Sequence, residues 1–205
     1  MNFSANKQFS SACERNREPI LATLRKVFSD RKHVLEIGSG TGQHAVFFGA
    51  ALSQLIWQTG DLPQSHPSIQ AWLQEAELTN VLSPIVVDMS KVDWETDLLD
   101  KGIDAVFTAN TCHIMAWSEV ERMFAGASRI LPAGGKLCVY GPFNYNGQFT
   151  SPGNAQFDAS LRAQAAHMGI RDIEAMQQLA GRHGFVMQAD HALPANNRLL
   201  AWQRN

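Results

Sequence analysis

A glycine-rich segment is the part of this chain whose residues are best suited to hold a ligand. Residues 36–42 read Glu-Ile-Gly-Ser-Gly-Thr-Gly and follow the apolar pair Val34 and Leu35. Glycine lets the backbone turn tightly and approach a ligand with no Cβ in the way. Free amides at the start of a following helix favour an anionic group. The segment therefore predicts a binding loop between a buried strand and a helix.

The residue types in this loop favour S-adenosylmethionine (SAM) over a dinucleotide. A dinucleotide fingerprint reads GxGxxG, whereas Gln43 stands where the third glycine of that pattern would be. The methionine carboxylate of SAM would suit the loop amides, and a carboxylate at Glu36 can order contacts to its cationic end. A turn-forming glycine loop of any α/β protein is the alternative. The predicted cofactor contacts in this segment are Glu36, Gly38, Ser39, Gly40 and Gly42.

Further cofactor contacts are predicted at the ends of later strands. Asp61 follows the second predicted strand, where a carboxylate can accept hydrogen bonds from both ribose hydroxyls. Asp88 ends the third strand and could accept from the adenine amino group, with Met89 against the ring. For both acids, capping of the following chain is the alternative. Asn110, after the fourth strand, is a further predicted contact.

The candidate catalytic residue is His113, at the carboxyl edge of the central strands, where doubly wound sheets bind ligands. A histidine there could remove a proton from an acceptor and would titrate near neutrality, whereas a hydrogen-bonded structural role is the alternative. The segment Asn110-Thr111-Cys112-His113 departs from the Asn/Asp-Pro-Pro-Tyr motif of amino-group methyltransferases of DNA and glutamine, so that acceptor chemistry loses support. Cys112 is expected to pack rather than to react.

An acceptor pocket is predicted beside His113. Asn16 lies on an N-terminal segment that could close over the cofactor, where Arg17 could pair with a carboxylate of the cofactor. A solvated charge run over residues 14–18 is the alternative for these two. Core packing is the alternative for the aromatics of the fifth strand. The predicted pocket residues are Asn16, Trp117, Tyr140, Phe143 and Asn144.

The elements that must position these residues alternate along the chain. Short apolar runs predict strands and apolar residues at helical spacing predict helices, the pattern of a parallel sheet covered by helices. The predicted strands are 33–37, 55–58, 85–87, 103–108, 136–140, 185–192 and 198–203. The predicted helices are 18–28, 42–52, 68–78, 119–131, 157–167 and 172–183, with a long loop over 141–153.

This element order predicts an α/β fold of the class I methyltransferase type. Five parallel strands followed by a C-terminal antiparallel hairpin make a Rossmann-like sandwich with a seven-stranded, mostly parallel sheet. A chain of 205 residues fits one domain, 1–205, in which residues 1–30 form an N-terminal segment and leading helix packed as a lid.

The composition and net charge limit the kinds of partner and ligand that this protein is expected to bind. Lys and Arg number 17 and Asp and Glu 19, so a net charge of −2 offers no electrostatic footprint for nucleic acid. The three cysteines form no CxxC pair and no metal-ligand spacing, which indicates a reducing cytoplasm and no metal. No apolar run is long enough to span a bilayer. A small-molecule acceptor is expected, and the oligomeric state is left open.

Several blocks of the sequence resemble the methyltransferase-like protein 26 family. They run through nearly the whole chain and cover residues 11–21, 34–44, Asn110 with His113-Ile114 and Trp117, 140–143, 169–172 and 194–197. The resemblance implies a SAM-dependent methyltransferase fold more firmly than it implies a reaction. The chain departs from that family at Leu193 and at Thr111-Cys112, on the acceptor side rather than the cofactor side.

Three functions therefore follow from the sequence as hypotheses. The leading one is a methyltransferase for a small molecule that aligns a nucleophile with the SAM methyl group for direct in-line displacement. The second is a SAM-binding regulatory module without turnover. The third is a nicotinamide-dependent oxidoreductase, which the Gln43 position disfavours.

Overall fold

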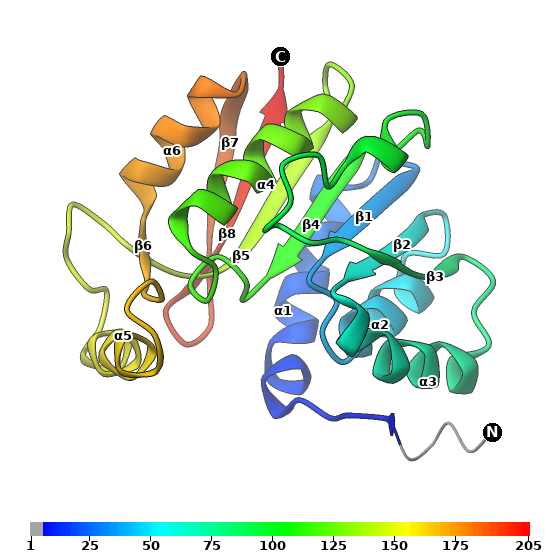
Figure 1. The fold of residues 1–205 in the computed structure, drawn as a ribbon, viewed down its shortest axis with the longest axis horizontal. Helices are drawn as coiled ribbons and strands as arrows, with labels where there is room; N and C mark the ends of the chain where they lie inside the picture. The colour runs from blue at the N-terminus through cyan, green and yellow to red at the C-terminus, as the bar shows by residue number, and fades with distance from the viewer. Residues whose placement is uncertain (1–5) are drawn as a thin grey trace.

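The computed structural model describes residues 6–205, and one twisted sheet runs through it (Figure 1). The strands lie in the order β3-β2-β1-β4-β5-β8-β7, with β6 paired to β5. The first five are parallel, and β8 is antiparallel to both β5 and β7. The predicted class I methyltransferase fold with its C-terminal hairpin is thus confirmed. The strands are β1 (His33–Ile37), β2 (Ile56–Asp61), β3 (Val81–Val86), β4 (Ala105–Ala109), β5 (Lys136–Asn144), β6 (Arg171–Asp172), β7 (Phe185–Leu193) and β8 (Asn197–Arg204).

Helices cover both faces of the sheet because successive strand residues point to opposite sides. On one face Val34 packs with residues of α1 and α2, and on the other Leu35 packs with residues of α4 and α6. Both faces of the central strands are buried, as in other parallel sheets. The helices are α1 (Ser11–Val27), α2 (Gln43–Ala51), α3 (His66–Ala76), α4 (Trp117–Ile130), α5 (Pro152–Gln164) and α6 (Ile173–Arg182), with short 3-10 turns η2 (Pro63–Ser65) and η3 (Thr96–Leu98).

Helix α1 begins well before the predicted start at residue 18. Ser10 caps it, because its hydroxyl accepts from the Cys13 amide, and Pro19 lies inside the helix instead of in its first turn. Burial of Ile20 and Leu24 holds this helix against the sheet and outweighs the backbone hydrogen bond that proline cannot donate. The longer helix carries Asn16 and Arg17 on its body, whereas the sequence placed them ahead of it.

Strand β5 is longer than predicted. Residues 141–144 were predicted to open a long loop, but they continue the strand, with Pro142 opposite Asn197 of β8 and Phe143 opposite Arg171 of β6. The pairing partners come from distant parts of the chain, so a local pattern rich in Gly, Pro and Asn could not reveal them. Within residues 6–205, no helix is both long and apolar enough to cross a membrane.

Candidate functional site

The glycine loop joins β1 to α2 and is tied to β2. The amides of Gly38 and Ser39 both donate to the Gly60 carbonyl, at 2.8 and 3.2 Å. Gly42 caps α2 with a φ of 95°, in the left-handed region that favours glycine. A Cβ there would lie 2.9 Å from the Ile69 Cα, so the loop also needs glycine to let α3 approach. Its shape is therefore fixed by the backbone of two neighbouring elements.

A cavity of about 920 Å³ opens beside this loop, at the carboxyl ends of the parallel strands. In Figure 1 the start of α1, helix α5 and the turn between β7 and β8 all lie at this end of the sheet. The cavity runs from the glycine loop to these three elements and is large enough for a cofactor and a small organic molecule together. Its lining residues are Ser10, Ala12, Cys13, Arg15, Asn16, Pro19, Gly38, Ser39, Gly40, Thr41, His44, Ala109, Asn110, His113, Tyr140, Pro142, Asn154, Phe157, Pro194, Ala195 and Asn197.

The structure brings together part of the predicted cofactor set. Gly38, Ser39, Gly40 and Asn110 line the cavity. The remaining predicted contacts lie outside this lining, and they are Glu36, Gly42, Asp61, Asp88, Met89 and Arg17.

Asp61 lies next to the glycine loop. It contacts Gly40, which lines the cavity, but does not line the cavity itself. Its Oδ2 accepts from the Gly40 amide and its Oδ1 from the Leu62 amide, both at 2.7 Å. The carboxylate therefore orders the loop and the chain that follows β2, which is the capping alternative. Each oxygen keeps a second lone pair, so a ribose contact is compatible with this arrangement.

Asp88 and Met89 follow β3 and lie outside the cavity lining. The Asp88 Oδ1 accepts from the Ser90 amide at 2.9 Å in a local turn, as the capping alternative predicts. Met89 is 6% exposed and packs in the core below α4. The Met89 side chain is therefore buried in the core and not available at the surface, which the local sequence did not reveal.

Glu36 points into the protein interior. The side chain is 2% exposed, and its Oε2 accepts from the Trp57 indole N–H at 3.1 Å. Burial raises its pKa to about 7, against the hydrogen bonds from Trp57 and Ser39 that favour the charged form. Glu36 thus supports the glycine loop from behind and offers no direct contact with a ligand in the cavity.

The raised pKa of Glu36 predicts an effect on stability with a definite sign. The protonated carboxyl is preferred in the fold, so this contribution is present below pH 4.5 and is lost as pH rises through about 7. Glu36→Gln keeps an acceptor for Trp57 and cannot ionise. We expect the variant to gain on the order of 2 to 3 kcal/mol relative to wild type between pH 5 and pH 8. Urea unfolding at both pH values measures this, with Glu18→Gln on the exposed side of α1 as the control. An equal difference at the two pH values would contradict the argument.

Only some of the predicted acceptor-pocket residues line the cavity. His113, Asn16 and Tyr140 line the cavity. Phe143 is 1% exposed and packs in the core, as the alternative stated. Asn144 is buried next to it, and Trp117 begins α4 beneath the Arg171 guanidinium, 5.9 Å from the ring centroid. Phe143 and Asn144 lie outside the cavity lining because β5 continues past the predicted loop start, and Trp117 lies outside it at the start of α4.

His113 is held in place by its surroundings and keeps its imidazole toward the cavity. Its carbonyl accepts from the Gly169 amide at 2.9 Å, and its ring lies edge-on to Phe157 with centroids 5.2 Å apart. A Cβ at Gly141 would lie 3.8 Å from the His113 Nδ1, so the backbone at Gly141 passes beside the ring. Burial, with a smaller effect of the Arg171 charge, lowers the pKa of His113 to about 4. At neutral pH the imidazole is uncharged and able to accept a proton.

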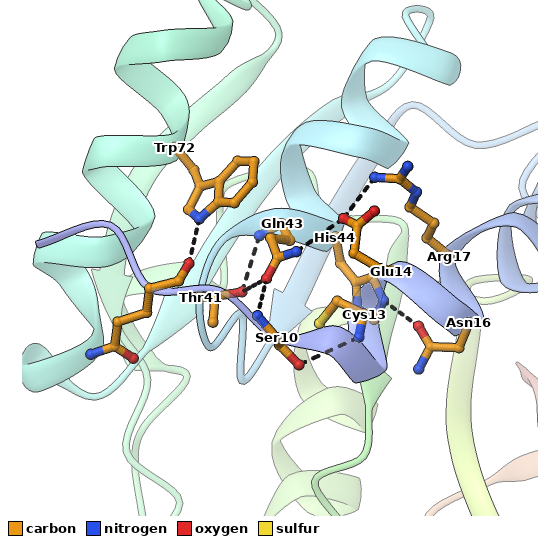
Figure 2. Close-up of polar contacts among 10 residues, drawn as sticks. Ser10, Cys13, Glu14, Asn16, Arg17, Thr41, Gln43, His44 and Trp72 are labelled. Atoms are coloured by element: carbon orange, nitrogen blue, oxygen red, sulfur yellow. Dashed lines mark hydrogen bonds and ion pairs between the residues drawn. The ribbon is translucent and has the colours of Figure 1, made fainter. Parts of the chain in front are cut away.

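A polar network fastens the start of α1 to the start of α2, and Figure 2 shows its members. The Gln43 amide group accepts from the Ser10 backbone at 2.5 Å and donates to Glu14 at 3.0 Å. The Asn16 Oδ1 lies 2.7 Å from the His44 Nε2. In the sequence, Gln43 served only as evidence against a dinucleotide site. In the structure it positions helix α1, which forms part of the cavity wall.

Arg17 takes part in this network and not in the cavity. Its guanidinium bonds the Glu14 carboxylate at 2.8 Å and lies over the Phe47 ring at 4.6 Å. A shift of two positions along α1 decides this outcome, because residues separated by two positions point to nearly opposite sides of a helix. Arg15 lines the cavity in its place.

The segment before α1 contacts the first two turns of α3. The Trp72 indole donates to the Gln8 carbonyl at 2.8 Å, and the Gln8 amide donates to the Ser68 hydroxyl at 3.0 Å. These contacts suit the predicted lid over residues 1–30, of which residues 1–5 lie outside the described part of the chain. A lid role remains a prediction.

Sequence reasoning missed several lining residues. Phe157 lies at the start of a predicted helix and Asn197 next to a predicted strand, yet both also line the cavity. His44 gave a usable signal, because it follows the glycine loop by two positions on α2. The α5 and hairpin residues gave none, since only the tertiary arrangement brings them to the glycine loop.

Comparisons with known proteins agree with the fold. An O-methyltransferase family protein from Burkholderia thailandensis superimposes with a TM-score of 0.80 at 17% identity, over 95% of this chain and 57% of that one. The apo S-adenosylmethionine-dependent methyltransferase SibL gives 0.78 at 21%, over 94% and 55%. Human N-acetylserotonin methyltransferase in complex with SAM gives 0.69 at 14%, over 94% and 56%. This chain spans little more than half the length of these proteins, and the likeness is one of fold.

The sequence itself also matches a family. The family model described as "Protein of unknown function (DUF938)" matches residues 7–204, which include the glycine loop, the cavity lining and the C-terminal hairpin. Because this match extends over nearly the whole chain, the protein belongs to the DUF938 family.

Proposed function

We propose that this protein is a SAM-dependent methyltransferase acting on a small organic acceptor. The observation that carries the proposal is the single cavity that joins the glycine loop to the uncharged imidazole of His113. SAM is bound in the human N-acetylserotonin methyltransferase structure, which shares this fold. The resemblance of the sequence blocks to the methyltransferase-like protein 26 family points the same way, and the three unpaired cysteines suit a reducing cytosol.

The glycine loop is proposed to hold the methionine end of the cofactor. Gly38, Ser39 and Gly40 present backbone at the cavity wall with no bulky side chain in front of it. Asp61 lies directly behind Gly40 and is the proposed partner of the ribose hydroxyls. When bound, the cofactor supplies a methyl group on a sulfonium, which is a good leaving group.

His113 is proposed to accept the proton that an acceptor hydroxyl or amine loses as its lone pair attacks the methyl carbon. Tyr140, Phe157 and Pro142 give the same part of the cavity apolar walls, which would exclude water from the nucleophile. Asn16 and Asn110 are the neutral polar groups able to orient the acceptor. The chain thus supplies alignment, desolvation and a base.

Cofactor identity is the first test of the proposal. SAM and its demethylated product should each raise the melting temperature, because ligand at about one hundred times its dissociation constant adds roughly 2.7 kcal/mol to the stability of the native state. For a chain of this size, that corresponds to a shift of about 5 to 10 °C in a thermal denaturation assay. NAD should give none. Stabilisation by NAD and not by SAM would overturn the assignment, and SAM binding without turnover on any acceptor would favour the regulatory module.

The second test concerns Asp61. Replacement by alanine removes hydrogen bonds between a charged acceptor and the ribose, which predicts a loss of about 1.5 to 3 kcal/mol and more than tenfold in SAM affinity by calorimetry. The lost bond to the Gly40 amide should also lower stability by about 1 kcal/mol. Unchanged affinity together with lowered stability would leave Asp61 as a loop support alone.

A further inference from the structure

We propose that Arg15 recognises an anionic group, a carboxylate or a phosphate, on the acceptor, so that the substrates of this protein are small organic anions. The inference rests on the proposed methyltransferase function and adds the substrate class. Arg15 lies on α1 at the cavity wall and is exposed at its mouth.

The residues that line the cavity include very few charged groups. Of the residues that line it, none is Asp or Glu, and Arg15 alone has a permanent charge. The two lining histidines are uncharged at neutral pH, because burial lowers the pKa of both His44 and His113 to about 4. The lining therefore carries a net positive charge.

Arg15 has no hydrogen-bond or ion-pair partner within residues 6–205. Nine of the eleven arginines donate to a carboxylate or carbonyl there, and only Arg15 and Arg25 do not. On the same helix Arg17 is paired with Glu14, while Arg25 lies in the last turn, away from the cavity. A guanidinium with all its donors free at a cavity mouth is suited to bidentate recognition of a carboxylate or phosphate.

The position of Arg15 on α1 favours the acceptor over the cofactor as the source of that anion. Glu14 and Asn16, on either side of Arg15 in the sequence, bond Gln43 and His44 at the start of α2, at 3.0 and 2.7 Å. Each lies about 100° from Arg15 around the helix, in opposite directions, so Arg15 points away from α2 and from the glycine loop that precedes it. The opposite end of the cavity is formed by Phe157, Asn154 and the turn at Ala195, where the acceptor would lie. The free amides at the loop remain for the cofactor's carboxylate.

Charge balance agrees with this placement. SAM carries a net positive charge, and Arg15 adds a second one in a cavity whose lining has no carboxylate. An acceptor with a negative charge would compensate these charges in a partly desolvated site, whereas a cationic acceptor would be repelled.

The experiment compares matched acids and neutral analogues. Hydroxyaryl carboxylates and aryl phosphates, each beside its amide or ester, are titrated against the protein with and without saturating S-adenosylhomocysteine, using thermal shift and calorimetry. We expect the anions to bind at least tenfold more tightly than their neutral counterparts. Arg15→Gln should remove that preference, while Arg25→Gln, an equally unpaired arginine on the same helix, should keep it.

Three results would overturn the proposal. They are equal binding of acids and neutral analogues, the absence of binding by any anion, and an unchanged preference in Arg15→Gln. A fourth is a matching loss of S-adenosylhomocysteine affinity in Arg15→Gln, which would assign Arg15 to the carboxylate of the cofactor. Failure of the wild-type protein to bind S-adenosylhomocysteine at all would count against the methyltransferase function, and the titration without it would still decide the role of Arg15.

Discussion

Replacing His113 by glutamine will lower methyl transfer by about 10²- to 10⁴-fold, the range that a positioned general base contributes, while SAM affinity stays close to wild type. The imidazole lines the cavity, its pKa is about 4, and it is uncharged at working pH. Its ring packs against Phe157, and glutamine can occupy most of the same space. The rate of methyl transfer is measured with an identified acceptor, and the affinity for SAM is measured by calorimetry.

The pH profile gives a separate check on His113. A base with a pKa of about 4 is already deprotonated above pH 5, so the rate should show no inflection from this group near neutrality. This differs from the sequence-based expectation and follows from burial, which disfavours the charged imidazolium. His167→Gln, at an exposed histidine outside the cavity, is the control and should change neither rate nor profile. A large drop in melting temperature in His113→Gln, with SAM affinity lost in parallel, would show that the residue is structural.

Substituting Gly42 by alanine will destabilise the whole domain and weaken SAM binding with it. The new Cβ would lie 2.9 Å from the Ile69 Cα and 3.3 Å from the Trp72 Cβ, at a φ of 95°. Left-handed strain of about 1 to 2 kcal/mol and overpacking of about 1 to 3 kcal/mol together predict a loss of about 2 to 5 kcal/mol. For a domain of this size, that lowers the melting temperature by about 5 to 15 °C.

Gly40→Ala is the matched comparison for Gly42. Its φ is 57°, but the nearest atom to a new Cβ would be the Gly38 carbonyl oxygen, 4.0 Å away. Only the backbone strain of about 1 to 2 kcal/mol remains, so the fold should tolerate the change better. Because Gly40 lines the cavity and Gly42 does not, SAM affinity should fall in Gly40→Ala with a smaller loss of stability than in Gly42→Ala. Equal losses of stability in the two variants would contradict the packing argument.

The two acids at the glycine loop show where local reasoning about the site reaches its limit. Spacing along the chain placed Glu36 and Asp61 near the ends of the first two strands, and both lie there. It could not show that Glu36 points at Trp57, nor that Asp61 already accepts from the Gly40 amide. Strand direction is a local property, but the choice between core and cavity depends on which side chains other elements bring.

The start of α1 could not be predicted from the local sequence either, because it depends on contacts with a distant part of the chain. Pro19 fits the first turn of a helix, and that local rule moved the predicted start too far along the chain. The hydroxyl cap at Ser10 and the bonds from Gln43 to Ser10 and Glu14 stabilise the earlier turns. Since Gln43 is distant in sequence, the register of cavity-facing residues on α1, including Arg15 in place of Arg17, was not accessible locally.

The sequence by itself determined the α/β alternation, the C-terminal hairpin and the glycine loop, because these depend on short-range periodicity and on the conformational freedom of glycine. It also placed His113 at the carboxyl edge of the sheet. Only the tertiary structure decided that α5 and the β7–β8 turn close the far side of the cavity, that β5 continues to Asn144, and that Glu36 and Phe143 belong to the interior. Those outcomes depend on pairing and burial between segments far apart in the chain, where competing packing interactions, and not local propensity, set the lowest free energy.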